Sequence, residues 1–134
     1  MPKKIQIKDV DVLRALLNRR IDDNLLVIIF WIAQEYGLCF TEGWREALRP
    51  GDVHDTDPLR ATDLRYWFYR PTVAKEIELA INERYEYDYK RPEKNCAWIH
   101  ESFNEDGTSR GVHFHIQVHP NTRRRESPSY GGVL

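Results

Sequence analysis

Residues 110 to 119, Arg110-Gly-Val-His-Phe-His-Ile-Gln-Val-His119, alternate between apolar and polar side chains without a break. Side chains along a β-strand point to opposite faces with a period of two, so this pattern predicts a strand. Its apolar face carries Val112, Phe114, Ile116 and Val118. Its polar face carries His113, His115, Gln117 and His119. Three of the five histidines in the chain therefore share one face of one strand, which favours a chemical site over a solvated edge.

A second strand is expected directly before this one, over residues 96–103. The segment Asn104-Glu-Asp-Gly107 that separates the two is typical of a hairpin turn. With a loop of two or four residues, the polar side chains of the two strands share a face, whereas a loop of three residues separates them. The polar positions concerned are Trp98, His100 and Ser102.

Three helices are expected earlier in the chain. The first runs from a cap at Asp9 or Asp11 to about residue 20, and the second follows the cluster 22–24 and ends near 36. The second is apolar nearly all round, which predicts a central buried helix. A third begins at Pro71 and ends near residue 84. Short strands are expected at 38–41, 61–67 and 85–89.

Helices followed by antiparallel strands predict an α+β domain. We expect a single antiparallel β-sheet with the N-terminal helices packed on one face and the histidine-bearing site on the other. The 134 residues suffice for one domain with a hydrophobic core. We place that domain at residues 1–120 and expect a basic, flexible tail at 121–134, because this segment combines Arg123-Arg124-Arg125 with glycine and proline.

Charge and composition exclude several classes of partner. The net charge is −1, with 20 basic and 21 acidic residues, so there is no overall attraction to nucleic acid or to an anionic membrane. The longest apolar run, residues 25–33, is far shorter than the roughly 20 residues that span a bilayer. No signal peptide is evident, so we expect synthesis in the cytoplasm with Cys39 and Cys96 as buried free thiols.

The polar face of the 110–119 strand suggests a metal site. Zinc in a hydrolytic centre takes about three protein ligands and leaves one position open. His113 and His115 have Cβ atoms roughly 6–7 Å apart on one strand face, which suits one ligand and one general base better than two ligands. The remaining ligands must come from another segment, and His54 and Asp63 are the candidates.

Four motifs resemble those of a known family in their order along the chain. They are Thr41-Glu-Gly-Trp-Arg45, Gly51-Asp-Val-His54, Ala61-Thr-Asp63-Leu and His113-Phe-His115. The family is the zinc peptidase superfamily of lysostaphin, the D-alanyl-D-alanine carboxypeptidases and the VanX-like dipeptidases, which includes small phage-encoded cell-wall peptidases. The resemblance covers roughly residues 22 to 119.

The resemblance implies a zinc metallopeptidase that hydrolyses peptide bonds of bacterial peptidoglycan. It implies that Zn²⁺ is bound by His54, Asp63 and His115, and that His113 is the general base. Arg45 would stabilise the tetrahedral oxyanion or bind a substrate carboxylate. The expected partner is a peptidoglycan-type peptide, reached by release to the cell wall on lysis.

This chain departs from the family pattern in two places. Eight residues separate His54 from Asp63 where the family has six, and the glycine and small residues between them are replaced. Asp55 or Asp57 is therefore an alternative ligand, although a strand would hold Asp63 more rigidly. The second departure, Trp44 in place of tyrosine, is mild.

Several candidates also have purely structural interpretations. Asp63 could pair with Arg60 or Arg65, and Arg45 could form a salt bridge with a helix. His119 precedes a proline and is more typical of a strand end than of a ligand. His100 is expected to fill the histidine face or to support another site residue.

Two other functional classes remain as alternatives. A His-hydrophobic-His strand also resembles that of metal-dependent nucleases that nick single-stranded DNA, but the tyrosine such enzymes need would have to be Tyr130, in a glycine-rich tail. A catalytically inactive virion or structural module could retain the same fold and ligands. Zinc content, hydrolysis of D-Ala-ending peptides and nicking of single-stranded DNA would separate the three classes.

Overall fold

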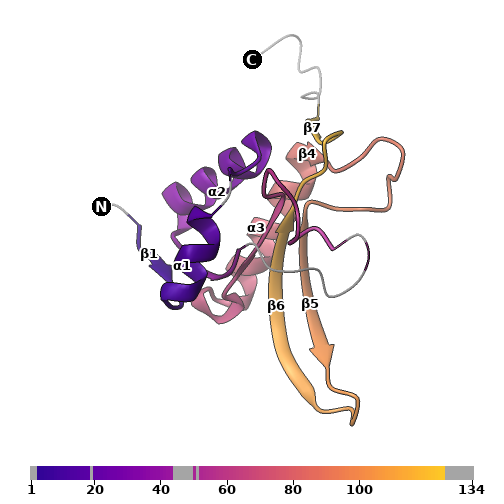
Figure 1. Cartoon of the computed structure of the whole chain (residues 1–134). Helices are drawn as coiled ribbons and strands as arrows, with labels where there is room; N and C mark the ends of the chain where they lie inside the picture. The colour runs from indigo at the N-terminus through magenta and orange to yellow at the C-terminus, as the bar shows by residue number, and fades with distance from the viewer. Residues whose placement is uncertain (1–2, 19, 44–49, 51, 126–134) are drawn as a thin grey trace.

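The computed structural model describes residues 3–18, 20–43, 50 and 52–125, and Figure 1 shows its course. Within these residues the chain is α+β, as predicted, with a five-stranded sheet in the order β1-β2-β3-β6-β5. The strands of this sheet are β1 (Ile5–Ile7), β2 (Leu38–Glu42), β3 (Ala61–Leu64), β5 (Ala97–Phe103) and β6 (Ser109–Gln117). The helices are α1 (Val10–Leu17), α2 (Asp23–Tyr36), α3 (Pro71–Arg84) and a short 3₁₀ helix η1 (Tyr66–Phe68).

The sheet is mixed, so the prediction of a purely antiparallel sheet is wrong at one edge. Strand β1 pairs parallel to β2, whereas β2, β3, β6 and β5 pair antiparallel. The parallel pair is possible because α1 and α2 lie between the two strands in the chain, and a parallel connection needs such a crossover. Strand β1 was not predicted from the sequence; its three residues are all exposed.

The helix boundaries follow from local capping. The side chain of Asp9 accepts a hydrogen bond from the backbone N–H of Val12 at 2.9 Å, which fixes the start of α1. Asp22 caps α2 in the same way, and Gly37 ends that helix with a φ of 73°, a conformation that favours glycine. Pro71 begins α3, where its missing N–H costs nothing. These ends lie within a few residues of the predicted ones.

The core lies between one face of the sheet and the helices α2 and α3. Phe114, Ile116 and Val118, on the apolar side of the predicted strand, are fully buried. The expectation that α2 is buried all round is wrong, because Val27 and Phe30 are 55% and 60% exposed. A helix packed against a sheet buries one stripe, and in α2 that stripe is Leu25, Ile28, Ile29 and Ile32.

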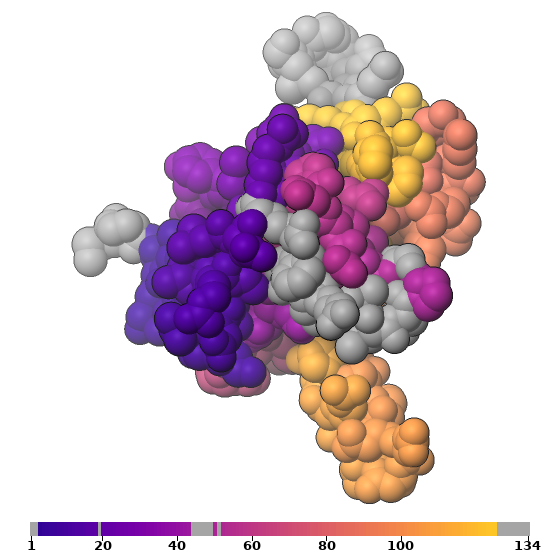
Figure 2. Space-filling view, viewed as in Figure 1, coloured from indigo at the N-terminus to yellow at the C-terminus, as the bar shows by residue number. Residues whose placement is uncertain are grey.

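The β5–β6 hairpin extends away from the body of the molecule (Figures 1 and 2). In its register, Trp98 lies opposite His115 and His100 lies opposite His113, so these side chains share one face. The loop between the two strands has an odd number of residues, which by itself would put these side chains on opposite faces of the sheet. A register shift at Ser102/Phe103 restores the shared face by inserting one extra residue on β6.

The folded chain continues beyond the expected boundary at residue 120. Strand β7 (Arg123–Arg124) pairs with β4 (Tyr85–Glu86) in a separate two-stranded sheet. Arg123 Nε also lies 3.1 Å from Glu86 Oε2. A two-residue strand is too short to show a periodic pattern, and for this reason the sequence predicted a flexible tail at 121–134 and not a strand at Arg123–Arg124. Among the described helices, none has the length and apolar character required to span a bilayer.

Candidate metal centre

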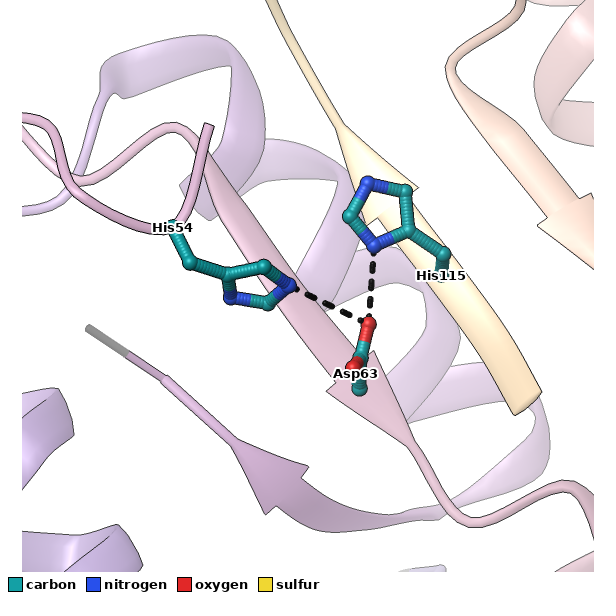
Figure 3. Close-up of side chains that lie close together, drawn as sticks. All are labelled: His54, Asp63 and His115. Atoms are coloured by element: carbon teal, nitrogen blue, oxygen red, sulfur yellow. Dashed lines mark hydrogen bonds and ion pairs between the residues drawn. The ribbon is translucent and has the colours of Figure 1, made fainter. Parts of the chain in front are cut away.

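Three ligand-type side chains from distant parts of the chain converge on one face of the sheet (Figure 3). His54 lies in the loop between β2 and β3, Asp63 lies on β3, and His115 lies on β6. Asp63 and His115 are direct cross-strand partners. Because His115 alternates with the buried Phe114, the group lies on the face opposite the core.

Asp63 is the centre of the group. Its Oδ1 atom lies 2.8 Å from His115 Nδ1 and 3.5 Å from His54 Nε2 (Figure 3, dashed lines). Burial by itself would raise the pKa of Asp63, but the hydrogen bonds with His115 and His54 outweigh burial and hold this pKa well below its usual range. The carboxylate is therefore ionised at neutral pH, which is the form that binds a cation. It does not pair with Arg60 or Arg65 in this arrangement.

His54 is held in one orientation by the backbone. Its side chain is 2% exposed, and its Nδ1 lies 2.9 Å from the carbonyl oxygen of Gly43. A carbonyl oxygen only accepts, so Nδ1 carries a hydrogen, and Nε2, the nitrogen that faces Asp63, is the atom available to a metal ion. The loop itself is fixed by a hydrogen bond from His54 N–H to Asp52 Oδ1 at 3.1 Å.

His115 is also hydrogen-bonded at both ring nitrogens. Nδ1 faces Asp63 Oδ1, and Nε2 lies 3.1 Å from the side-chain oxygen of Gln117. The two histidine rings lie with their centroids 5.2 Å apart, tilted by 60° to one another. Each ring thus presents one nitrogen to Asp63 and donates from the other nitrogen to a neutral oxygen.

This geometry fits a metal ion. One nitrogen from each histidine and one carboxylate oxygen of Asp63 all lie within 4.8 Å of one another. Ligands about 2.1 Å from a tetrahedral ion are about 3.4 Å apart, so the described side chains need only small shifts to surround one. The group contains Asp63, and neither Asp55 nor Asp57 belongs to it.

His113 shares the face of the metal group without being part of it. Its Nε2 lies 2.7 Å from Ser102 Oγ on the neighbouring strand. His100 stacks on Trp98 with ring centroids 3.8 Å apart and lies 5.5 Å from the His113 ring. Burial is the main cause that lowers the pKa of His100, and its electrostatic interactions with the neighbouring His113 and His115 lower it further.

The remaining candidates lie elsewhere or cannot be placed. His119 is separate from the metal group, with its Nδ1 3.8 Å from Asp88 Oδ2 and its ring against Tyr87. Arg45 belongs to residues 44–49, which lie outside the described residues, so its role stays a prediction.

Sequence reasoning missed the partners that orient the two histidines. Gln117 was placed on the histidine face by the alternation, but no role was assigned to it. Gly43 contributes its backbone carbonyl, a group that every residue has, so the residue type gives no sign of this role. Ser102 was placed correctly near His113, and only the register revealed that the two are hydrogen-bonded.

Comparisons of this chain with models of protein families, with curated proteins and with solved structures gave no match. Function therefore has to be inferred from the residues themselves. What they offer is two imidazoles and one carboxylate around a position that a metal ion could occupy, with a third histidine two residues away on the same strand face.

Proposed function

We propose that this protein is a zinc-dependent hydrolase of peptide bonds in bacterial cell-wall peptides, with His54, Asp63 and His115 as the metal ligands. The observation that carries the proposal is the convergence of these three side chains on one face of the sheet. Both histidines present a ring nitrogen to the same carboxylate oxygen. The substrate class is supported by the resemblance of the ordered motifs to the cell-wall zinc peptidases.

The donor set favours zinc over the harder cations. Magnesium and calcium prefer shells made entirely of oxygen ligands, whereas two imidazole nitrogens and one carboxylate oxygen suit zinc. Three protein ligands are also the number found in catalytic zinc centres, which keep the fourth position for water or substrate. Bound there, zinc would supply Lewis acidity that makes water a nucleophile near neutral pH.

His113 is the proposed proton acceptor. It lies on the same strand face as His115, two residues away, a spacing that suits a side chain beside the metal group that does not itself bind the ion. Its hydrogen bond with Ser102 fixes the ring on that face. A general base takes the proton of the attacking water, which an imidazole can do near neutral pH, and His113 is proposed for this role because of its place on the strand face.

Arg45 is the proposed electrostatic group. In the peptidases that the motifs resemble, an arginine in the corresponding motif, ahead of the first histidine, binds the substrate or the developing oxyanion. A guanidinium in that role lowers the barrier by stabilising charge that appears only in the transition state. This part of the proposal depends on the sequence motif alone.

Replacing His113 tests the assignment of roles. His113→Ala should keep zinc and lose about 10²- to 10⁴-fold in turnover of D-Ala-ending peptidoglycan peptides, because general base catalysis is worth that much. The measurement pairs zinc content with product release, followed by chromatography. Full activity in His113→Ala would contradict the base assignment.

Activity assays of the wild-type protein separate the functional classes. Chelation with EDTA should abolish hydrolysis, and added zinc should restore it. If the zinc-loaded protein cuts neither D-Ala-ending nor cross-linked peptides, the hydrolase proposal is overturned in favour of an inactive module. If it nicks single-stranded DNA instead, the nuclease alternative replaces it.

A further inference from the structure

We infer that Gln117 is a positioning residue for the metal centre, which fixes His115 so that Nδ1 is its ligand atom. This inference rests on the proposed metal centre and adds a residue that contacts neither the ion nor the substrate. It starts from the hydrogen bonds that surround the His115 ring.

The orientation of the Gln117 amide follows from its second partner. Gln117 Nε2 lies 2.8 Å from the backbone carbonyl oxygen of Asn95. That oxygen can only accept, so the NH₂ end of the amide faces Asn95 and the oxygen end faces His115. At 3.1 Å from His115 Nε2, this oxygen requires Nε2 to carry the hydrogen.

The consequence for His115 is a defined ligand atom. With Nε2 donating to Gln117, the nitrogen left for a metal ion is Nδ1, which lies 2.8 Å from Asp63 Oδ1 and would exchange its hydrogen bond with that oxygen for the ion. Without Gln117, Nε2 would lose its fixed partner and the ring could rotate or exchange tautomers. Partners of this kind also raise the basicity of a ligating imidazole.

Gln117 is held rigidly enough for this role. Its backbone N–H donates to the carbonyl of Cys96 at 2.7 Å, so the main chain and the side chain of Gln117 are anchored to adjacent residues. Across the sheet its partner on β3 is the small, fully buried Ala61. The amide is thus fixed between β6 and the segment leading into β5.

His54 has the same arrangement built from the backbone. Its Nδ1 donates to the carbonyl of Gly43, which leaves Nε2 for the ion. The two ligand histidines are therefore each oriented by a neutral oxygen, but only the one at His115 belongs to a side chain. That makes the His115 side of the centre open to a direct mutational test.

The test compares Gln117→Leu and Gln117→Glu with the wild-type chain. Gln117→Leu removes the acceptor and should weaken zinc binding by about 10- to 100-fold, measured by competition with a chromophoric chelator. Gln117→Glu keeps an acceptor for Nε2–H and should recover most of the loss. Gln34→Leu, an exposed glutamine on α2, is the matched control and should bind zinc as the wild type does.

Nitrogen-15 NMR of the histidine rings gives a readout that a merely structural role would not change. In the zinc-loaded wild type, His115 should bind through Nδ1 and carry a hydrogen on Nε2. Unchanged zinc affinity in Gln117→Leu, equal losses in the Leu and Glu variants, or ligation through Nε2 would each overturn the inference. If the wild-type chain binds no zinc, the proposed metal centre falls as well, and this result is distinct from a change confined to Gln117→Leu.

Discussion

At the scale of single residues, Asp63 organises the candidate site. One of its carboxylate oxygens contacts both ligand histidines, and it lies directly across the sheet from His115. The carboxylate is largely removed from water, with 16% of its side chain exposed. An ionised group in such a place has to be compensated, by the two histidines when no ion is bound and by a cation when one is.

Asp63→Asn should therefore destabilise the metal-free protein in a pH-dependent way. The folded-state pKa of Asp63 is depressed, so its contribution is fully present above the unfolded value of about 3.9 and is lost as the pH falls below that value. We expect a loss of about 1–2 kcal/mol in the free energy of unfolding at pH 6, which shrinks towards pH 2.5. Urea denaturation at the two pH values measures this, and an equal loss at both would contradict the assigned charge.

The three residues of the candidate metal group were predictable from the sequence, but the residues that orient them were not. Period-two alternation placed His115 on the face opposite the core, and motif order brought in His54 and Asp63. Their eight-residue separation left Asp55 and Asp57 open as ligands, and the register between β3 and β6 favours Asp63 because it lies opposite His115. Gln117 and the Gly43 carbonyl act through orientation, and orientation depends on tertiary contacts that no local pattern encodes.

At the scale of elements, the β5–β6 hairpin determines which side chains share a face with the candidate metal group. The register shift near Ser102 brings Trp98 and His100 to the face of His115 and His113. Gly111 lies at this irregularity with a φ of 100°, a value that side-chain-bearing residues rarely adopt. The turn residues predicted a hairpin. The register shift, which compensates for the odd number of residues in the loop, could not be predicted from the turn alone.

Gly111→Ala should destabilise the protein by about 1 kcal/mol or more, through backbone strain alone, because an added Cβ would meet no atom within 4 Å. The exposed neighbour Arg110 is the control, and Arg110→Ala should change the free energy of unfolding by less than about 0.5 kcal/mol. Chemical denaturation of both variants checks the difference. Equal stability of Gly111→Ala and the wild type would show that the irregularity does not need glycine.

The elements that sequence reasoning missed are short. Strand β1 has three exposed residues, and β7 has two residues, which pair with the predicted strand at Tyr85–Glu86. Helix α2 was predicted correctly in extent, but its apolar composition did not reveal that one side stays exposed. Burial depends on what packs against a helix, and composition alone does not contain that information.

At the scale of the whole molecule, the fold separates stability from the candidate site. One face of the central strands is buried against helices, and the opposite face carries the histidines. The core is formed by apolar side chains, so the chain should fold without metal. Metal binding should then add stability by mass action rather than create the fold.

Zinc should raise the melting temperature of the protein. At a free zinc concentration about 100 times the dissociation constant, binding adds about 2.7 kcal/mol, which corresponds to about 10 °C for a chain of this size. Differential scanning calorimetry with and without zinc measures the shift, and EDTA should reverse it. A melting temperature that does not respond to zinc would contradict a specific site in the folded state.

The most direct test of the central claim is the zinc stoichiometry of the purified chain, measured by titration calorimetry and elemental analysis. We expect one zinc ion per wild-type chain, no specific binding in His54→Ala or His115→Ala, and full binding in His119→Asn, a histidine outside the group. An absence of zinc from the wild type, or one full equivalent retained by His115→Ala, would contradict the metal centre formed by His54, Asp63 and His115.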